Sequence, residues 1–103
     1  MITLTSLEET IKHTLKDSYD LTTQETNPGK TIQYKHKNEL NLISVFIYKR
    51  KIKISFYEKE SLEDFSYVLK DYYHFYEDEY EKAIKKLLSI KTKVNLTQIF
   101  SKN

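Results

Sequence analysis

Residues 52–57 read IKISFY and alternate strictly between apolar and polar side chains. Ile52, Ile54 and Phe56 fall on one side, and a period of two residues is typical of a strand that buries one face. No other segment predicts a strand as strongly. The chain must therefore contain a sheet.

Two neighbouring segments extend this prediction. Residues 31–37 place Ile32, Tyr34 and His36 on one face and polar side chains on the other. Residues 40–48 are rich in β-branched and aromatic side chains and are apolar on both faces, which is typical of a central strand. Short polar breaks separate these segments, so we expect an antiparallel meander.

The meander is expected to begin with a short strand over residues 21–26. The next four residues, Asn27-Pro28-Gly29-Lys30, form the strongest turn signal in the chain. Proline followed by glycine favours a type II turn, in which the glycine takes a positive φ. With this strand included, we predict a sheet of three to four strands.

Helical patterns flank the predicted sheet. Ser6 and Glu9 have the spacing of a capping box, and an apolar stripe with helical spacing follows, made of Leu4, Leu7, Ile11 and Leu15. A second helix is predicted to start at Ser61, with Asp64 three positions later. Its stripe continues to Ile90 through Leu62, Phe65, Leu69, Tyr72, Tyr73, Tyr76, Tyr80, Ala83, Ile84 and Leu87.

These patterns predict one α+β domain over residues 1–103. We expect an N-terminal helix, the antiparallel sheet, and a long C-terminal amphipathic helix packed on the sheet. The pattern weakens after residue 91, which leaves open whether residues 93–103 are a loosely docked tail. It also leaves open whether the long helix is continuous or kinked near His74.

Composition excludes several chemistries. The absence of cysteine excludes disulfides and cysteine nucleophiles, and the single glycine excludes a P-loop or a dinucleotide fingerprint. Three scattered histidines form no recognisable zinc site. We therefore expect no enzyme activity, no cofactor and no metal. The N-terminal residues lack a signal-peptide pattern and no apolar run could span a membrane, so we expect a cytoplasmic protein without membrane contact.

Charge is unevenly distributed although the net charge is only +2. Residues 30–57 hold seven basic side chains against Glu39, whereas residues 58–81 hold nine acids against Lys59 and Lys70. Such asymmetry bears on binding partners rather than on the fold.

The acidic segment supplies the first candidate site. On a helix, one exposed line would carry Tyr67, Asp71, His74 and Asp78, with Phe75 and Glu81 beside it. Aromatic side chains among carboxylates suit a surface that binds a basic protein. We therefore predict a small non-enzymatic protein that binds and inhibits another protein, as immunity proteins, antitoxins and phage counter-defence factors do. Acid–base catalysis by His74 with a neighbouring carboxylate is a weaker reading, because it also needs a pocket and an oxyanion-stabilising group, and the sequence places neither.

The basic segment supplies the alternative, a nucleic-acid-binding module. Its candidate residues are Lys35, Lys37, Lys49, Arg50, Lys51 and Lys53. Tyrosines lie close to them in the sequence, and lysines with aromatic rings suit single-stranded nucleic acid. Arg50 is the only arginine, which weakens this reading because arginine is the preferred base-reading side chain. Self-association into a homodimer through the long helix also remains open.

Overall fold

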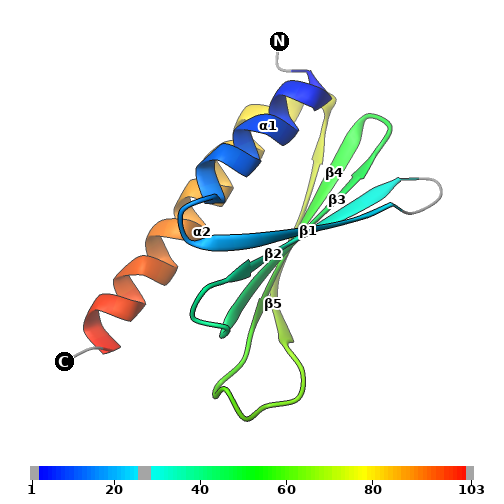
Figure 1. Cartoon of the computed structure of the whole chain (residues 1–103). Helices are drawn as coiled ribbons and strands as arrows, with labels where there is room; N and C mark the ends of the chain where they lie inside the picture. The colour runs from blue at the N-terminus through cyan, green and yellow to red at the C-terminus, as the bar shows by residue number, and fades with distance from the viewer. Residues whose placement is uncertain (1–2, 26–28, 102–103) are drawn as a thin grey trace.

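The computed structural model describes residues 3–25 and 29–101. One helix precedes a five-stranded sheet, and a second helix follows it after a single 3₁₀ turn, η1 (Figure 1). The elements are α1 (Leu4–Leu15), β1 (Tyr19–Glu25), β2 (Lys30–His36), β3 (Asn41–Tyr48), β4 (Lys51–Glu58), β5 (Val68–Tyr76), η1 (Glu77–Glu79) and α2 (Tyr80–Ser101). The α+β class is therefore confirmed.

The sheet is an antiparallel meander in which each strand pairs with the next, in the order β1-β2-β3-β4-β5. Its central strand is β3, as the apolar character of both its faces predicts. The predicted count of three to four strands is too low, because a fifth strand, β5, extends the sheet beyond β4.

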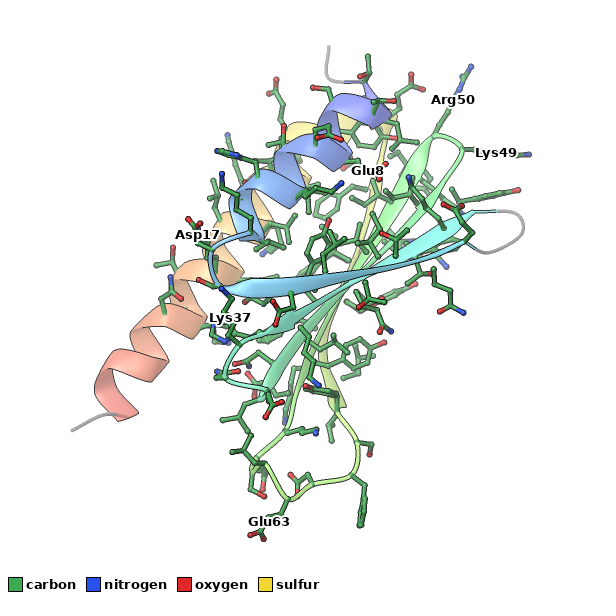
Figure 2. All side chains as sticks on the ribbon, viewed as in Figure 1. Glu8, Asp17, Lys37, Lys49, Arg50 and Glu63 are labelled. Atoms are coloured by element: carbon green, nitrogen blue, oxygen red, sulfur yellow. The ribbon has the colours of Figure 1, made fainter. Side chains whose placement is uncertain are left out.

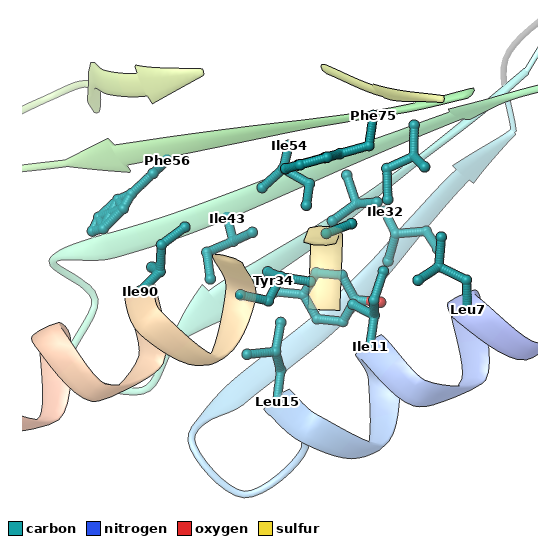
Figure 3. Packing of buried hydrophobic residues seen from close by; sticks show 14 of the residues in the cluster. Leu7, Ile11, Leu15, Ile32, Tyr34, Ile43, Ile54, Phe56, Phe75 and Ile90 are labelled. Atoms are coloured by element: carbon teal, nitrogen blue, oxygen red, sulfur yellow. The ribbon is translucent and has the colours of Figure 1, made fainter. Parts of the chain in front are cut away.

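Both helices cover one face of the sheet, and the hydrophobic core lies between these two layers (Figures 1 and 3). The buried positions of β2 and β4 alternate as predicted, with Ile32 and Tyr34 on β2 and Ile52 and Ile54 on β4. The predicted α1 stripe is also buried, at Leu7, Ile11 and Leu15. These side chains fix which sheet face is covered and which is left open.

The prediction of a long second helix is wrong over its first half. Residues 68–76 form β5, and α2 begins only at Tyr80. The segment VLKDYYHFY is dominated by aromatic and β-branched side chains, which fit a pleated sheet better than a helix. Pairing with β4 satisfies the backbone groups on one edge of this strand, whereas a 30-residue helix would have overhung the sheet.

The predicted helix start at Ser61 is a turn instead. The Asp64 carboxylate accepts the backbone N–H of Glu60 at 3.0 Å and of Ser61 at 3.2 Å. The same Ser-x-x-Asp spacing can therefore close a loop, because short polar side chains bond to nearby backbone in turns as well as at helix caps.

The predicted turn at Asn27 and Pro28 lies outside the described residues. Gly29 is described, and it has no positive φ. A side chain there would instead collide with the backbone carbonyl of Ile47, so the glycine allows the start of β2 to approach β3 closely.

The second half of the predicted helical stripe is confirmed on α2. Tyr80, Ala83, Leu87 and Ile90 are all buried, and α2 continues as a helix through residue 101. Lys91 donates from Nζ to the backbone carbonyl of Thr14 at 2.8 Å, which ties α2 to the end of α1.

Candidate functional site

The six residues of the predicted acidic line do not share a surface. In a strand the side chains alternate, so Asp71 and Phe75 point to the helix-covered side of β5 while His74 points away from it. Phe75 is part of the hydrophobic core. The remaining two acids lie further along the chain, with Asp78 in η1 and Glu81 in the first turn of α2.

Tyr67 has a structural contact. It lies in the loop before β5, and its hydroxyl donates to the backbone carbonyl of Glu39 at 3.0 Å. The Lys59 ammonium lies 4.7 Å from the centre of the Tyr67 ring. This side chain therefore fixes the 59–67 loop against the β2–β3 turn.

The predicted basic residues are largely brought together. Lys35, Lys51 and Lys53 alternate with the buried positions of β2 and β4, so they point away from the helices. Lys49 and Arg50 form the tip of the β3–β4 hairpin, as Figure 2 shows. Lys37 lies apart from them, in the turn at the opposite end of β2.

We call the sheet surface that points away from the helices the open face. Strand register places its side chains in rows across the sheet. One row contains Thr31, Phe46, Lys53 and His74, the next Gln33, Ser44, Ser55 and Tyr72, and the row nearest the hairpin tip Tyr48, Lys51 and Tyr76. Tyr57 lies in a further row with Leu42, Leu69, Lys35 and Asp20.

Aromatic rings and ammonium groups are neighbours on the open face. The Phe46 and Tyr48 rings are 6.3 Å apart between centres, with planes only 24° from parallel. Lys53 Nζ lies 5.6 Å from the Phe46 ring centre, and Lys51 Nζ lies 5.7 Å from that of Tyr48. These distances are within the usual cation–π range, so the rings help to hold the ammonium groups in place.

The edge of the open face is formed by exposed aromatic side chains of β5. Tyr72 and Tyr76 are each about half exposed. The Tyr72 hydroxyl is hydrogen-bonded to Nε2 of His74, and the two rings meet edge to face. This contact holds both rings in one orientation, in a place that a planar ligand can reach.

Charge on the open face is almost entirely positive. Among the outward strand positions in the described part of the chain, Asp20 is the one acid, and it lies opposite Lys35. The acids of residues 58–64 belong to the end of β4 and the loop that follows it, and Glu63 lies far from the hairpin tip in Figure 2. The lysines of the open face can therefore attract a polyanion, although the three acids of η1, Glu77–Glu79, adjoin this face at the hairpin tip.

Sequence reasoning missed Phe46, Tyr72 and Tyr76 as surface residues. Phe46 lies in a strand that is apolar on both faces, so its side could not be distinguished by alternation. The two tyrosines were placed on a helical core stripe, and only the pairing of β5 with β4 brings them beside the lysines. Residues 72–76 read YYHFY and show no clear polar alternation, so the sequence held no signal that would have placed these tyrosines on a strand.

The described residues contain no cluster of three or more histidine and acidic side chains suited to a metal ion. Within the same residues, no helix has the length and apolar character needed to cross a membrane. Comparison with protein-family models, curated proteins and solved structures finds no match.

Proposed function

We propose that this protein binds single-stranded nucleic acid on its open face, by stacking and phosphate contacts rather than by catalysis. The observation that carries the proposal is the shared, uncovered surface of aromatic rings and lysines near the hairpin tip. Single-strand binding proteins combine such rings, on which bases stack, with cations that follow the phosphates.

The ring-to-ammonium geometry supports this partner over others. A base that stacks on Phe46 or Tyr48 would take the place of the Lys53 or Lys51 ammonium over the ring, and that ammonium, within 6 Å of the ring centre, could then contact the phosphate of the same nucleotide. A second copy of the chain suits this face poorly, since Lys35, Lys51 and Lys53 would then meet the same positive charges.

The predicted inhibitor that binds a basic protein through an acidic helix face stays a prediction. The residues chosen for it are spread over both sides of β5, η1 and α2, so they give no single docking surface. For this reason the lysine-rich alternative is the function that the geometry favours.

The test is a fluorescence-anisotropy titration with a labelled single-stranded DNA or RNA of about twelve nucleotides. Binding should weaken steeply between about 50 and 200 mM salt. The double substitution Lys51→Gln with Lys53→Gln should reduce the slope of log affinity against log salt by about 1.4, because each phosphate contact on a single strand contributes about 0.7. Tyr48→Ala should weaken binding by about 1–3 kcal/mol if a base stacks there.

The matched control is Lys12→Gln with Lys85→Gln, which removes the same charge from exposed positions on α1 and α2. This variant should keep most of the wild-type affinity. The proposal fails if no oligonucleotide binds at low salt, or if the control loses as much affinity as the open-face variant. It also fails if poly-glutamate of equal charge competes as well as the oligonucleotide, because the face would then select an acidic protein.

A further inference from the structure

A shallow hollow of about 470 Å³ lies where the open face ends at the hairpin tip. It is lined by Arg50 of the hairpin, Tyr76 of β5, and Glu77 and Asp78 of η1. Its volume is within the range of about 300–1,000 Å³ that is typical of small-molecule sites. Acidic side chains at this place need an explanation, because they adjoin a face suited to a polyanion.

Two of the three consecutive acids of η1 have partners within the protein. Glu77 Oε2 lies 3.5 Å from Nε of Arg50. The Glu79 carboxylate accepts the backbone N–H of Tyr76 at 3.3 Å and lies 3.9 Å from Nζ of Lys82. Asp78 is exposed, and its carboxylate makes no hydrogen bond or ion pair with any residue that the structure describes. The hollow therefore contains one carboxylate free to accept hydrogen bonds from a ligand.

The other two side chains of the hollow add a stacking surface and donors. Tyr76 is 54 % exposed as a residue and continues the row of Tyr48 and Lys51. The ion pair with Glu77 engages Nε of Arg50, which leaves its terminal N–H groups able to donate. A flat ligand could stack on Tyr76, donate hydrogen bonds from one edge to Asp78, and accept a hydrogen bond from Arg50 beside those donors.

Guanine is the nucleic-acid base with that arrangement. Its Watson–Crick edge presents two adjacent donors, the N1–H and the 2-amino group, next to the O6 acceptor, and splayed single-strand bases are read on this edge. We propose that the hollow binds one guanine of the bound strand, stacked on Tyr76, with Asp78 accepting from N1–H and the 2-amino group and Arg50 donating to O6. This inference rests on the proposed single-strand binding and adds a base preference to it.

The experiment compares oligonucleotides of about nine nucleotides that differ at one central base in an all-thymine background. The central base is guanine, inosine, adenine or thymine. Wild-type protein should bind the guanine strand about tenfold more tightly than the thymine strand, as a good bidentate contact implies. Inosine, which lacks the 2-amino group, should fall between guanine and adenine.

The decisive variant is Asp78→Ala, with Glu63→Ala as a control that removes an acid at the opposite end of the sheet. Asp78→Ala should abolish the guanine preference while binding the thymine strand slightly more tightly, because one negative charge near the phosphates is gone. Glu63→Ala should keep the wild-type preference.

The outcomes separate the two proposals. If all strands bind with equal affinity, the guanine site is wrong and single-strand binding stands. If no strand binds, both are wrong. If the guanine preference survives Asp78→Ala, the hollow is not the site that reads the base.

Discussion

At the scale of single residues, His36 shows how burial couples the fold to pH. Its side chain is 5 % exposed at the end of β2, with its ring edge-on to Tyr19 at 4.7 Å between centres. Nδ1 accepts the backbone N–H of Asn38 at 3.0 Å, so this nitrogen carries no proton in the folded chain. Burial lowers the pKa of His36 from its ordinary value of 6.5, and this effect exceeds the opposite effect of a hydrogen bond with the Asn38 side chain.

This lowered pKa predicts a loss of stability in acid. The unfolded chain takes up a proton near pH 6.5, whereas folded His36 does so only at lower pH. Its contribution is therefore fully present above pH 6.5 and is lost as the pH falls from there toward the lowered pKa, by at most about 1.4 kcal/mol per pH unit. Urea unfolding at a series of pH values measures this slope.

The pH dependence should be reduced in His36→Gln. His13→Gln, which changes an exposed histidine on α1, should leave it in place. An equal slope below pH 6.5 in wild type and His36→Gln would show that other groups cause the loss.

At the scale of helices and strands, the spacing of apolar residues predicted the structure correctly where a segment fitted only the helical or only the strand period. Residues 52–57 alternate in a way that no helix produces, and β4 forms there. Residues 68–76 fit both periods, because their four aromatic side chains can line a helical stripe or stand on either face of a strand. The pairing partner decides between them, and single-segment patterns do not contain that information. Because residues 68–76 were predicted to be helical, the predicted site was wrong as well. Tyr72, Tyr76 and His74 reach the open face only as strand residues.

The contact between α1 and α2 leads to a prediction about the stability of the protein. Carbonyl groups in the last turn of a helix lack intrahelical partners, and Lys91 donates to that of Thr14 at 2.8 Å from a partly buried position. Lys91→Met keeps the apolar stem but removes the donor. We expect it to lower the free energy of unfolding by about 1–2 kcal/mol.

Chemical denaturation monitored by circular dichroism would measure this change. Lys85→Met, at an exposed position of the same helix, should change the stability by less than about 0.5 kcal/mol. Equal effects of the two substitutions would mean that the Thr14 contact contributes nothing.

At the scale of the whole molecule, the two helices cover one face of the sheet. The lysines of the open face repel the same face of a second copy of the protein. The open face exposes an aromatic surface that would bury apolar area if two copies met. Lys35, Lys51 and Lys53 oppose this, because each copy would bring the same charges into contact. The lysines thus serve two purposes in this proposal, attracting a polyanion and preventing self-association.

This balance predicts how the oligomeric state responds to charge. Sedimentation velocity should show a monomer at low salt, and Lys51→Gln with Lys53→Gln should shift the protein toward dimers, since the rings remain and the repulsion is reduced. Salt above about 0.1 M should move wild type in the same direction, because the screening length falls to about 10 Å. The control Lys12→Gln with Lys85→Gln should remain monomeric at low salt. A wild-type dimer at low salt that the open-face substitutions dissociate would reverse the argument, because the open face would then be occupied by a second copy rather than available to nucleic acid.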